Sequence, residues 1–134
     1  MIDARTAPYG ALLLRVISGA LFIAHGLLKV LVFTVPGTVK FFASIGYPGF
    51  VAYLVILAEL GGGLALILGL WTRWIAIILF VEMLGVIRFH FPHGWLFTAK
   101  GGGWEYPALW AVALAVLALL GNGAFAISGR RRTR

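Results

Sequence analysis

A carboxylate lies in the middle of one long apolar stretch of the sequence. Glu59 belongs to the run 50–70 and is followed closely by three consecutive glycines at 61–63. A charged group at that depth in a lipid bilayer is costly, so it must face a partner, a cavity or water. The glycines would let a neighbouring helix approach closely, as small residues do at helix interfaces in membranes. We therefore expect this helix to carry both a buried charge and a close-packed face.

The first apolar stretch, 11–33, carries a stripe of polar and small residues. Its members recur every three or four positions, so they share one helical face. They are Arg15, Ser18, Gly19, Phe22, His25, Gly26 and Lys29. Leu, Val and Ile occupy the opposite side, which suits contact with lipid. The stripe is therefore predicted to face the interior of a helix bundle.

Further ionisable residues fall at similar depths in the later stretches. Glu82 and Arg88 lie in the run 74–91, and Glu105 opens the run 104–127. At about 1.5 Å per helical residue, the deepest groups lie roughly 10–14 Å below the outer ends of their helices, and Lys29 and Arg88 roughly 5 Å below, with Glu105 at the edge. The deepest groups are His25, Glu59 and Glu82. The sequence thus predicts a polar pocket in the outer half of the membrane, drawing on all of these stretches.

The predicted pocket residues divide into two roles. His25, Glu59 and Glu82 are candidate pocket or proton-handling groups, and Lys29, Arg88 and Glu105 are candidate anion-orienting or ion-pair groups. The set carries one excess negative charge when its histidine is neutral, so a proton on one carboxyl or on His25 would neutralise it. Such a cluster could hold or relay a proton.

Structural roles for the same residues stay open at this stage. Buried ion pairs can simply fix helix register and partner choice. The long side chains of Lys29 and Arg88 could extend to the membrane surface. Glu105 begins a helix, where a carboxylate is stabilised by the exposed amides.

Composition assigns the chain to the membrane. Of its 134 residues, 62% are hydrophobic and 11% are charged, whereas soluble domains average about 25% charged residues. That length allows four membrane helices of about 20 residues each. We predict one all-α transmembrane domain, 1–134, folded as an integral membrane four-helix bundle. A Pro- and Gly-bounded connector includes a short interfacial segment, 38–45, with a plain loop as the alternative.

The distribution of basic residues predicts the topology. Arg5, Arg15, Arg73 and the terminal run of arginines would lie on one side of the membrane. The positive-inside rule then places both termini in the cytoplasm. A basic run beside a membrane helix indicates anionic lipid rather than nucleic acid as its partner.

Several chemistries are excluded or disfavoured. The chain has no Cys, which excludes disulfide exchange and thiolate catalysis within it. His90 and His93 are separated by Pro92 and have no obvious third ligand, so no metal site is predicted. His25 and His90 differ in depth by about 8 Å, which disfavours haem. No complete catalytic motif is present, and the sequence leaves enzymatic activity open.

The chain resembles the DoxX family of small four-helix membrane proteins from about residue 10 to 128. The resemblance rests on short motifs in a fixed order, which are His25-Gly26-Leu27-Leu28-Lys29, Glu59-Leu60-Gly61-Gly62, Gly69-Leu70-Trp71-Thr72-Arg73 and Gly102-Gly103-Trp104-Glu105-Tyr106. The family takes its name from a subunit associated with thiosulfate:quinone oxidoreductase in sulfur-oxidising archaea. The resemblance implies a multi-pass protein of a prokaryotic plasma (inner) membrane that is associated with an oxidoreductase.

Three functions follow as hypotheses. The leading one is a membrane subunit of a redox system that binds a quinone-like or small anionic molecule in the pocket, with quinone as the one candidate cofactor. The lipid bilayer, subunits of a redox complex or further copies of the chain would be its partners. The alternatives are a non-catalytic assembly or scaffold protein with structural ion pairs, and a small-solute or proton transporter.

Overall fold

The computed structural model describes residues 2–129, and this part of the chain contains helices and no strands. The first long helix is α1 (Ala7–Leu27), continued by a π-helical turn, η1 (Leu28–Val32). A short helix, α2 (Val35–Ser44), follows. The second long helix, here called α3–α4, consists of α3 (Phe50–Leu57), a π-helical turn η2 (Ala58–Gly62) and α4 (Gly63–Leu68). The last long helices are α5 (Thr72–His90), which ends in the 3₁₀ turn η3 (Phe91–His93), and α6 (Glu105–Leu120).

Three helical segments are long and apolar enough to cross a membrane. They are Ala7–Val32, Phe50–Leu68 and Thr72–His93, whereas α6 has 16 residues and is shorter. Many large apolar side chains on these helices are exposed, including Leu13, Leu57, Val81, Leu109 and Leu119. An exposed apolar surface this extensive is suited to lipid rather than to water.

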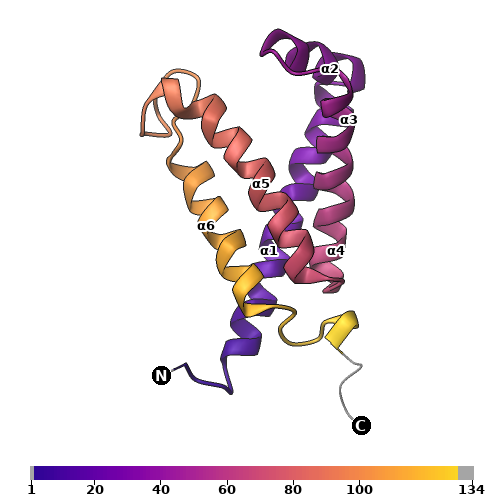
Figure 1. Cartoon of the computed structure of the whole chain (residues 1–134), viewed down its shortest axis with the longest axis vertical. Helices are drawn as coiled ribbons and strands as arrows, with labels where there is room; N and C mark the ends of the chain where they lie inside the picture. The colour runs from indigo at the N-terminus through magenta and orange to yellow at the C-terminus, as the bar shows by residue number, and fades with distance from the viewer. Residues whose placement is uncertain (1, 130–134) are drawn as a thin grey trace.

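The long helices form two pairs. In Figure 1, α5 and α6 run side by side, and α1 runs along α3–α4. The pairs meet near the end of the molecule where α1 begins, and they diverge toward α2. The core lies where they meet, with Phe22, Leu66, Leu79, Leu114 and Leu117 almost fully buried.

The short helix α2 forms in the connector, where a loop was the alternative. It begins at Val35, before the predicted 38–45, and Pro36 lies in its first turn, where a missing N–H costs nothing. Thr34 caps the helix by accepting a hydrogen bond from the Gly37 amide at 3.2 Å.

The fourth helix is shorter than the sequence predicted. It was expected over 104–127, but it ends at Leu120. Gly121 and Gly123 both adopt positive φ angles, of 80° and 69°. Glycine reaches this region without steric cost, so the pair ends the helix. The following segment crosses the end of the bundle, where the Ala124 amide donates to the Pro8 carbonyl at 2.9 Å.

Arg15 holds this end of the molecule together from inside it. Its side chain is buried, with 1% exposed, and among residues 2–129 its guanidinium donates to backbone carbonyls alone. The acceptors are Leu66 and Ile67 at the end of α4, and Asn122 and Ala124 after α6. The last carbonyls of a helix have no partner within the helix and carry partial negative charge. One arginine therefore satisfies the end of α4 and fixes the segment after α6.

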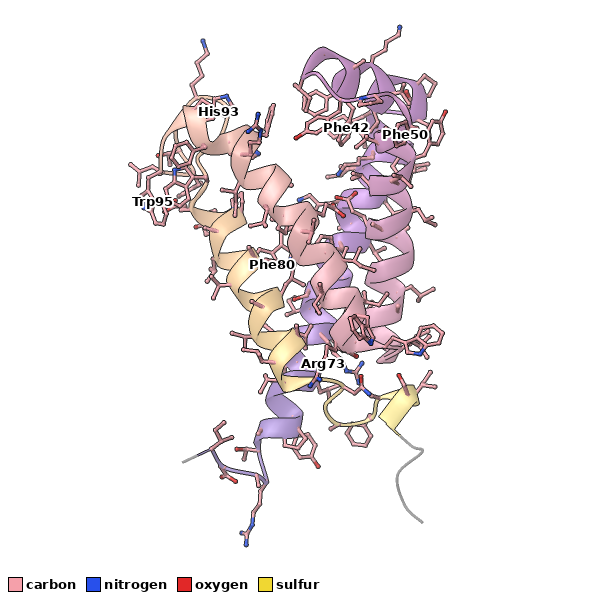
Figure 2. The ribbon with its side chains drawn as sticks, viewed as in Figure 1. Phe42, Phe50, Arg73, Phe80, His93 and Trp95 are labelled. Carbon is pink, nitrogen blue, oxygen red and sulfur yellow. The ribbon has the colours of Figure 1, made fainter. Side chains whose placement is uncertain are left out.

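The two ends of the described chain lie at the same end of the molecule. The start of α1 and the last described turn, Ile127–Gly129, are both at the bottom of Figure 1. In Figure 2 Arg73 lies at this end, while Phe42, His93 and Trp95 lie at the opposite one. The arginines at 130–132 and 134, which the sequence prediction of topology used, lie outside the described residues.

Glycines bring α1 and α3–α4 into backbone contact. A Cβ added to Gly63 would lie 2.7 Å from the carbonyl oxygen of Gly19, and one added to Gly19 would lie 2.5 Å from that of Gly63. Gly62 packs instead against Leu79 of α5, and a Cβ on Gly61 would meet only Leu57 of its own helix, at 3.9 Å. Of the three consecutive glycines, Gly62 and Gly63 thus have the predicted role in close helix packing, and Gly61 does not.

Replacing Gly63 with Ala should separate the two helices. Because the new methyl would overlap the Gly19 backbone, we expect Gly63→Ala to lower the free energy of unfolding by about 1–3 kcal/mol. Gly61→Ala, which adds the same methyl to an open face, should be neutral or slightly stabilising. Unfolding midpoints of the purified variants in detergent measure both effects. Equal midpoints for the two variants would contradict the packing contact.

Candidate functional site

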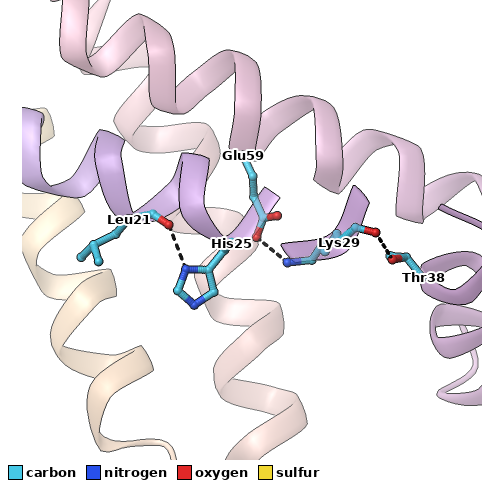
Figure 3. A network of polar contacts seen from close by, with 5 residues as sticks. All are labelled: Leu21, His25, Lys29, Thr38 and Glu59. Atoms are coloured by element: carbon cyan, nitrogen blue, oxygen red, sulfur yellow. Dashed lines mark hydrogen bonds and ion pairs between the residues drawn. The ribbon is translucent and has the colours of Figure 1, made fainter. Parts of the chain in front are cut away.

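An ion pair joins the two π-helical turns. Lys29 lies in η1 and Glu59 in η2, and the Lys29 Nζ is 2.7 Å from the Glu59 Oε1. The two side chains point toward one another across the helix interface (Figure 3), and they are 19% and 6% exposed. Single π-turns inside α-helices are rare and occur frequently at functional sites. Both helices thus depart from regular geometry at the point where their charges meet.

The helix α2 is tied to this pair through Thr38. Its buried hydroxyl lies 3.1 Å from the Lys29 carbonyl oxygen and 2.9 Å from that of Thr34. The contact with Lys29 is visible in Figure 3. α2 is therefore hydrogen-bonded to the backbone of the same residue whose side chain makes the ion pair.

His25 lies one turn before Lys29 on α1. Its Nδ1 is 2.8 Å from the carbonyl oxygen of Leu21. A carbonyl oxygen only accepts, so Nδ1 carries the proton of this hydrogen bond, which leaves Nε2 for another partner. The ring packs against Trp110 of α6, with 5.3 Å between centroids. His25 thus contributes a polar edge to the space between α1 and α6.

Glu82 of α5 completes the polar cluster. It lies close enough to Glu59 and Lys29 for their charges to interact. One oxygen of each carboxyl, Oε2 in both cases, is buried without a hydrogen-bond partner among the described residues. Buried polar atoms nearly always have a partner, and Glu82 lies within side-chain hydrogen-bond reach of Glu59, so a proton shared by the two carboxyls or a bound ligand would satisfy these oxygens. The cluster of Lys29, Glu59 and Glu82 has two carboxyls for one cation, and a single added proton makes it neutral.

A cavity of about 960 Å³ surrounds the cluster. It lies between the two helix pairs and includes side chains from α1, α2, α3–α4, α5 and α6. Apart from the polar cluster, His25, Ser18 and His90, its lining is mainly aliphatic and aromatic. Small-molecule sites have this character, being apolar with a few placed polar groups and about 300–1,000 Å³ in volume.

Four of the six predicted site residues line this cavity, and two do not. His25, Lys29, Glu59 and Glu82 are in its wall. Arg88 is exposed and borders a second, smaller pocket beside Ile45 and Tyr47. Glu105 accepts a hydrogen bond from the Phe97 amide at 2.8 Å. Its carboxylate therefore holds the loop before α6.

Two histidines lie close together at the C-terminal end of α5. His90 lines the cavity, and its Nδ1 is 3.0 Å from the Gly102 carbonyl oxygen. Its ring centroid is 5.8 Å from that of His93. Within residues 2–129 no three His, Cys, Asp or Glu residues are grouped as metal ligands would be.

Trp110 is a cavity residue that sequence reasoning missed. It packs against Phe22 at 4.3 Å between ring centroids, as well as against His25. Its Nε1 is buried without a hydrogen-bond partner among the described residues. A buried tryptophan N–H usually has a partner, and a lone Trp in an Ala- and Leu-rich helix was a signal that could have been noticed. The cavity wall thus includes a donor as well as acceptors.

The comparisons with known proteins come from one family model and several relatives. The model described as DoxX matches residues 10–99. A protein of Bacillus subtilis (strain 168) named "Putative oxidoreductase CatD" is 44% identical over 78 residues, which are 58% of this chain and 57% of the relative. "Inner membrane protein YqjF" of Escherichia coli (strain K12) is 41% identical over 68 residues, 51% of each chain. The matched segments thus span little more than half of these two relatives.

A third relative matches almost end to end. It is an uncharacterized protein of Haemophilus influenzae (strain ATCC 51907 / DSM 11121 / KW20 / Rd), 35% identical over 127 residues, which are 92% of this chain and 91% of the relative. No solved structure matches the chain. The long apolar helices, the matched family and the inner-membrane relative identify the chain as a multi-pass protein of a prokaryotic inner membrane, so the lipid bilayer is its environment.

The energetic link between Lys29 and Glu59 can be measured with a double-mutant cycle. Lys29→Met leaves two carboxyls facing each other without a cation, so it should destabilise the protein more than Glu59→Gln does. Because the residues are in contact, we expect a coupling free energy of about 0.5–3 kcal/mol between the two changes. Unfolding midpoints of both single variants and the double variant give this value. Lys40→Met, on the exposed face of α2, is the control, and strictly additive effects would refute the pair.

Proposed function

Because the chain belongs to the DoxX family of membrane proteins, we propose that it is a membrane subunit of a redox system. In this proposal the cavity around Lys29, Glu59 and Glu82 binds a quinone-like or small anionic molecule. The observation that carries the proposal is a pair of unpartnered carboxyl oxygens beside an ammonium group in a large apolar cavity. A relative named as a putative oxidoreductase supports the redox assignment.

The residues present fit the head group of a quinone. Such a head has carbonyl oxygens that accept hydrogen bonds and, when reduced, hydroxyls that donate them. The ammonium of Lys29 and the indole N–H of Trp110 are donors, and the Oε2 atoms of Glu59 and Glu82 are acceptors. A bound quinone would supply the electron-carrying chemistry.

The chain's own part in this proposal is to bind, orient and move protons. His25 has one ring nitrogen directed to a backbone carbonyl and the other available to a ligand. With Glu59 and Glu82 it forms the proton-handling set, while Lys29 holds negative charge in place. In this proposal a partner subunit would deliver or remove the electrons.

A scaffold role is the second candidate, and one observation favours it. The Lys29–Glu59 pair joins two helices that already share a backbone contact at Gly19 and Gly63. Buried pairs of this kind can serve to fix one helix register. In that case the cavity would be incidental, and loss of the Glu59 charge would affect stability without affecting any ligand.

The membrane topology is part of the proposal. We infer that α6 crosses the bilayer as a fourth helix and that both termini are cytoplasmic. Its 16 residues span roughly 24 Å, less than the typical hydrocarbon thickness of about 30 Å, and local thinning accommodates such a mismatch at modest cost. Exposed Trp71 and Trp74 at one end, and Trp95 at the other, have the placement of interfacial aromatic residues.

Single cysteines can test this topology without a background signal, because the chain contains none. An impermeant maleimide added to intact spheroplasts should label Lys40→Cys and Lys100→Cys. Arg5→Cys and Ile127→Cys should react only after the membrane is permeabilised. Labelling of Ile127→Cys from outside would show that α6 does not cross.

Ligand binding can be tested on gently purified protein. Mass spectrometry and the absorption spectrum should reveal a retained quinone in the wild type, and Glu59→Gln should reduce the retained amount at least about tenfold, since each lost interaction of 1.4 kcal/mol is a factor of ten. Glu105→Gln is the matched control, because its carboxylate lies outside the cavity. Unchanged retention in a folded Glu59→Gln protein would refute the proposed site and leave the scaffold role.

A further inference from the structure

The cavity extends well beyond the polar cluster. Its wall on α1 runs from Leu14 to Lys29, which corresponds to roughly 22 Å along the helix. The charged groups occupy only part of this length, and the inner part is lined by apolar side chains such as Leu14, Ile17 and Ala113. A head group that fits between Lys29 and Glu82 would therefore leave a long apolar section unfilled.

The apolar section is open to the surface that faces lipid. Several of its lining residues are themselves substantially exposed, with Ile17 on α1 at 55%, Leu21 at 43% and Leu109 on α6 at 64%. Ile17 and Leu21 lie in the middle part of α1, and Leu109 lies in the second turn of α6. The cavity thus reaches the bilayer sideways, between α1 and α6.

We propose that the ligand is a single-chain amphiphile that enters from the bilayer. Its oxygen-bearing head lies at Lys29, Glu59 and Glu82, and its apolar chain lies along Ile17 and Ala113 between α1 and α6. Burying the chain removes apolar surface from both the ligand and the cavity wall, and the open side lets it enter without leaving lipid. The inference rests on the proposed function and adds that the ligand carries an apolar chain.

Matched pairs of substitutions on α1 and α6 distinguish residues that line the apolar section of the cavity, where the ligand's chain would lie, from residues that do not. Ala113 and Ala115 are both half-buried on α6, but only Ala113 lines the cavity. Ala113→Phe should fill the chain section, and Ala115→Phe should leave it empty. A second pair on α1 covers the case in which Ala113→Phe does not fold, since Ile17 lines the cavity and Leu13, at 70% exposed, does not. Ile17→Trp and Leu13→Trp are the corresponding variants.

Two of the three probes share one head group and differ in whether they carry an apolar side chain. A 1,4-naphthoquinone without a side chain is compared with the same head carrying two isoprene units, and dodecanoic acid tests an anionic head. Binding to the protein in lipid nanodiscs is measured as ligand retained per protein, with empty nanodiscs as the correction for partitioning into lipid.

The wild type should bind the chain-bearing naphthoquinone at least about tenfold more tightly than the bare head. Ala113→Phe or Ile17→Trp should remove this difference, while Ala115→Phe and Leu13→Trp should keep it. Equal binding of the two naphthoquinones, or equal effects within a matched pair, would overturn the chain inference and leave the proposed head site intact.

The other outcomes separate the two proposals. Binding of dodecanoic acid that depends on Ala113 and Ile17, without binding of either naphthoquinone, would support the chain inference and refute the quinone assignment. Binding of none of the three probes would overturn both.

Discussion

The backbone contact between Gly19 and Gly63 is the constraint on which the rest of the molecule depends. It brings α1 against α3–α4 at a distance that no side chain would allow. Beyond this contact both helices widen into π-turns, and these present Lys29 and Glu59 to each other. A charge pair in an apolar medium requires close approach, because neither charge has water as an alternative. The close packing of α1 against α3–α4 thus allows the polar cluster in the cavity wall to be stable.

Sequence reasoning placed the deep groups well and the peripheral ones poorly. Glu59 and Glu82 were expected at similar depth and Lys29 nearer the end of its helix, and all three line one cavity, since helical rise relates residue number to depth. Depth says nothing about direction around a helix or about loops. Arg88 is exposed and borders a second pocket, and Glu105 is bound to a loop amide, although both were expected in the pocket. The π-turns carry no pattern in the sequence, since a regular helix has the same composition.

The end of the molecule where α1 begins was the part least accessible to prediction. Arg15 was expected on the interior face of its helix, and its burial confirms this, but its four backbone carbonyl acceptors were not predicted. Its partners are backbone atoms brought together by the fold, so no residue type in the sequence announces them. The fourth helix was predicted to continue to residue 127 from its apolar composition, which does not show that Gly121 and Gly123 adopt positive φ angles and end it. The sequence motifs and the hydrophobic pattern were sufficient to predict the family and the all-helical class.

The arrangement around Arg15 has a consequence for the order of biogenesis. The arginine belongs to α1, yet two of its acceptors, Asn122 and Ala124, follow α6 in the sequence, 107 and 109 residues later. Until those residues are made, its guanidinium has to remain partly with water or lipid phosphates near the membrane surface, because a charge without its full set of partners is not stable inside the bilayer. Closing this end of the molecule is therefore a late step that needs the segment after α6. A chain released before residue 121 would lack two of the four acceptors of this arginine, and such a defect is one that membrane proteases could recognise.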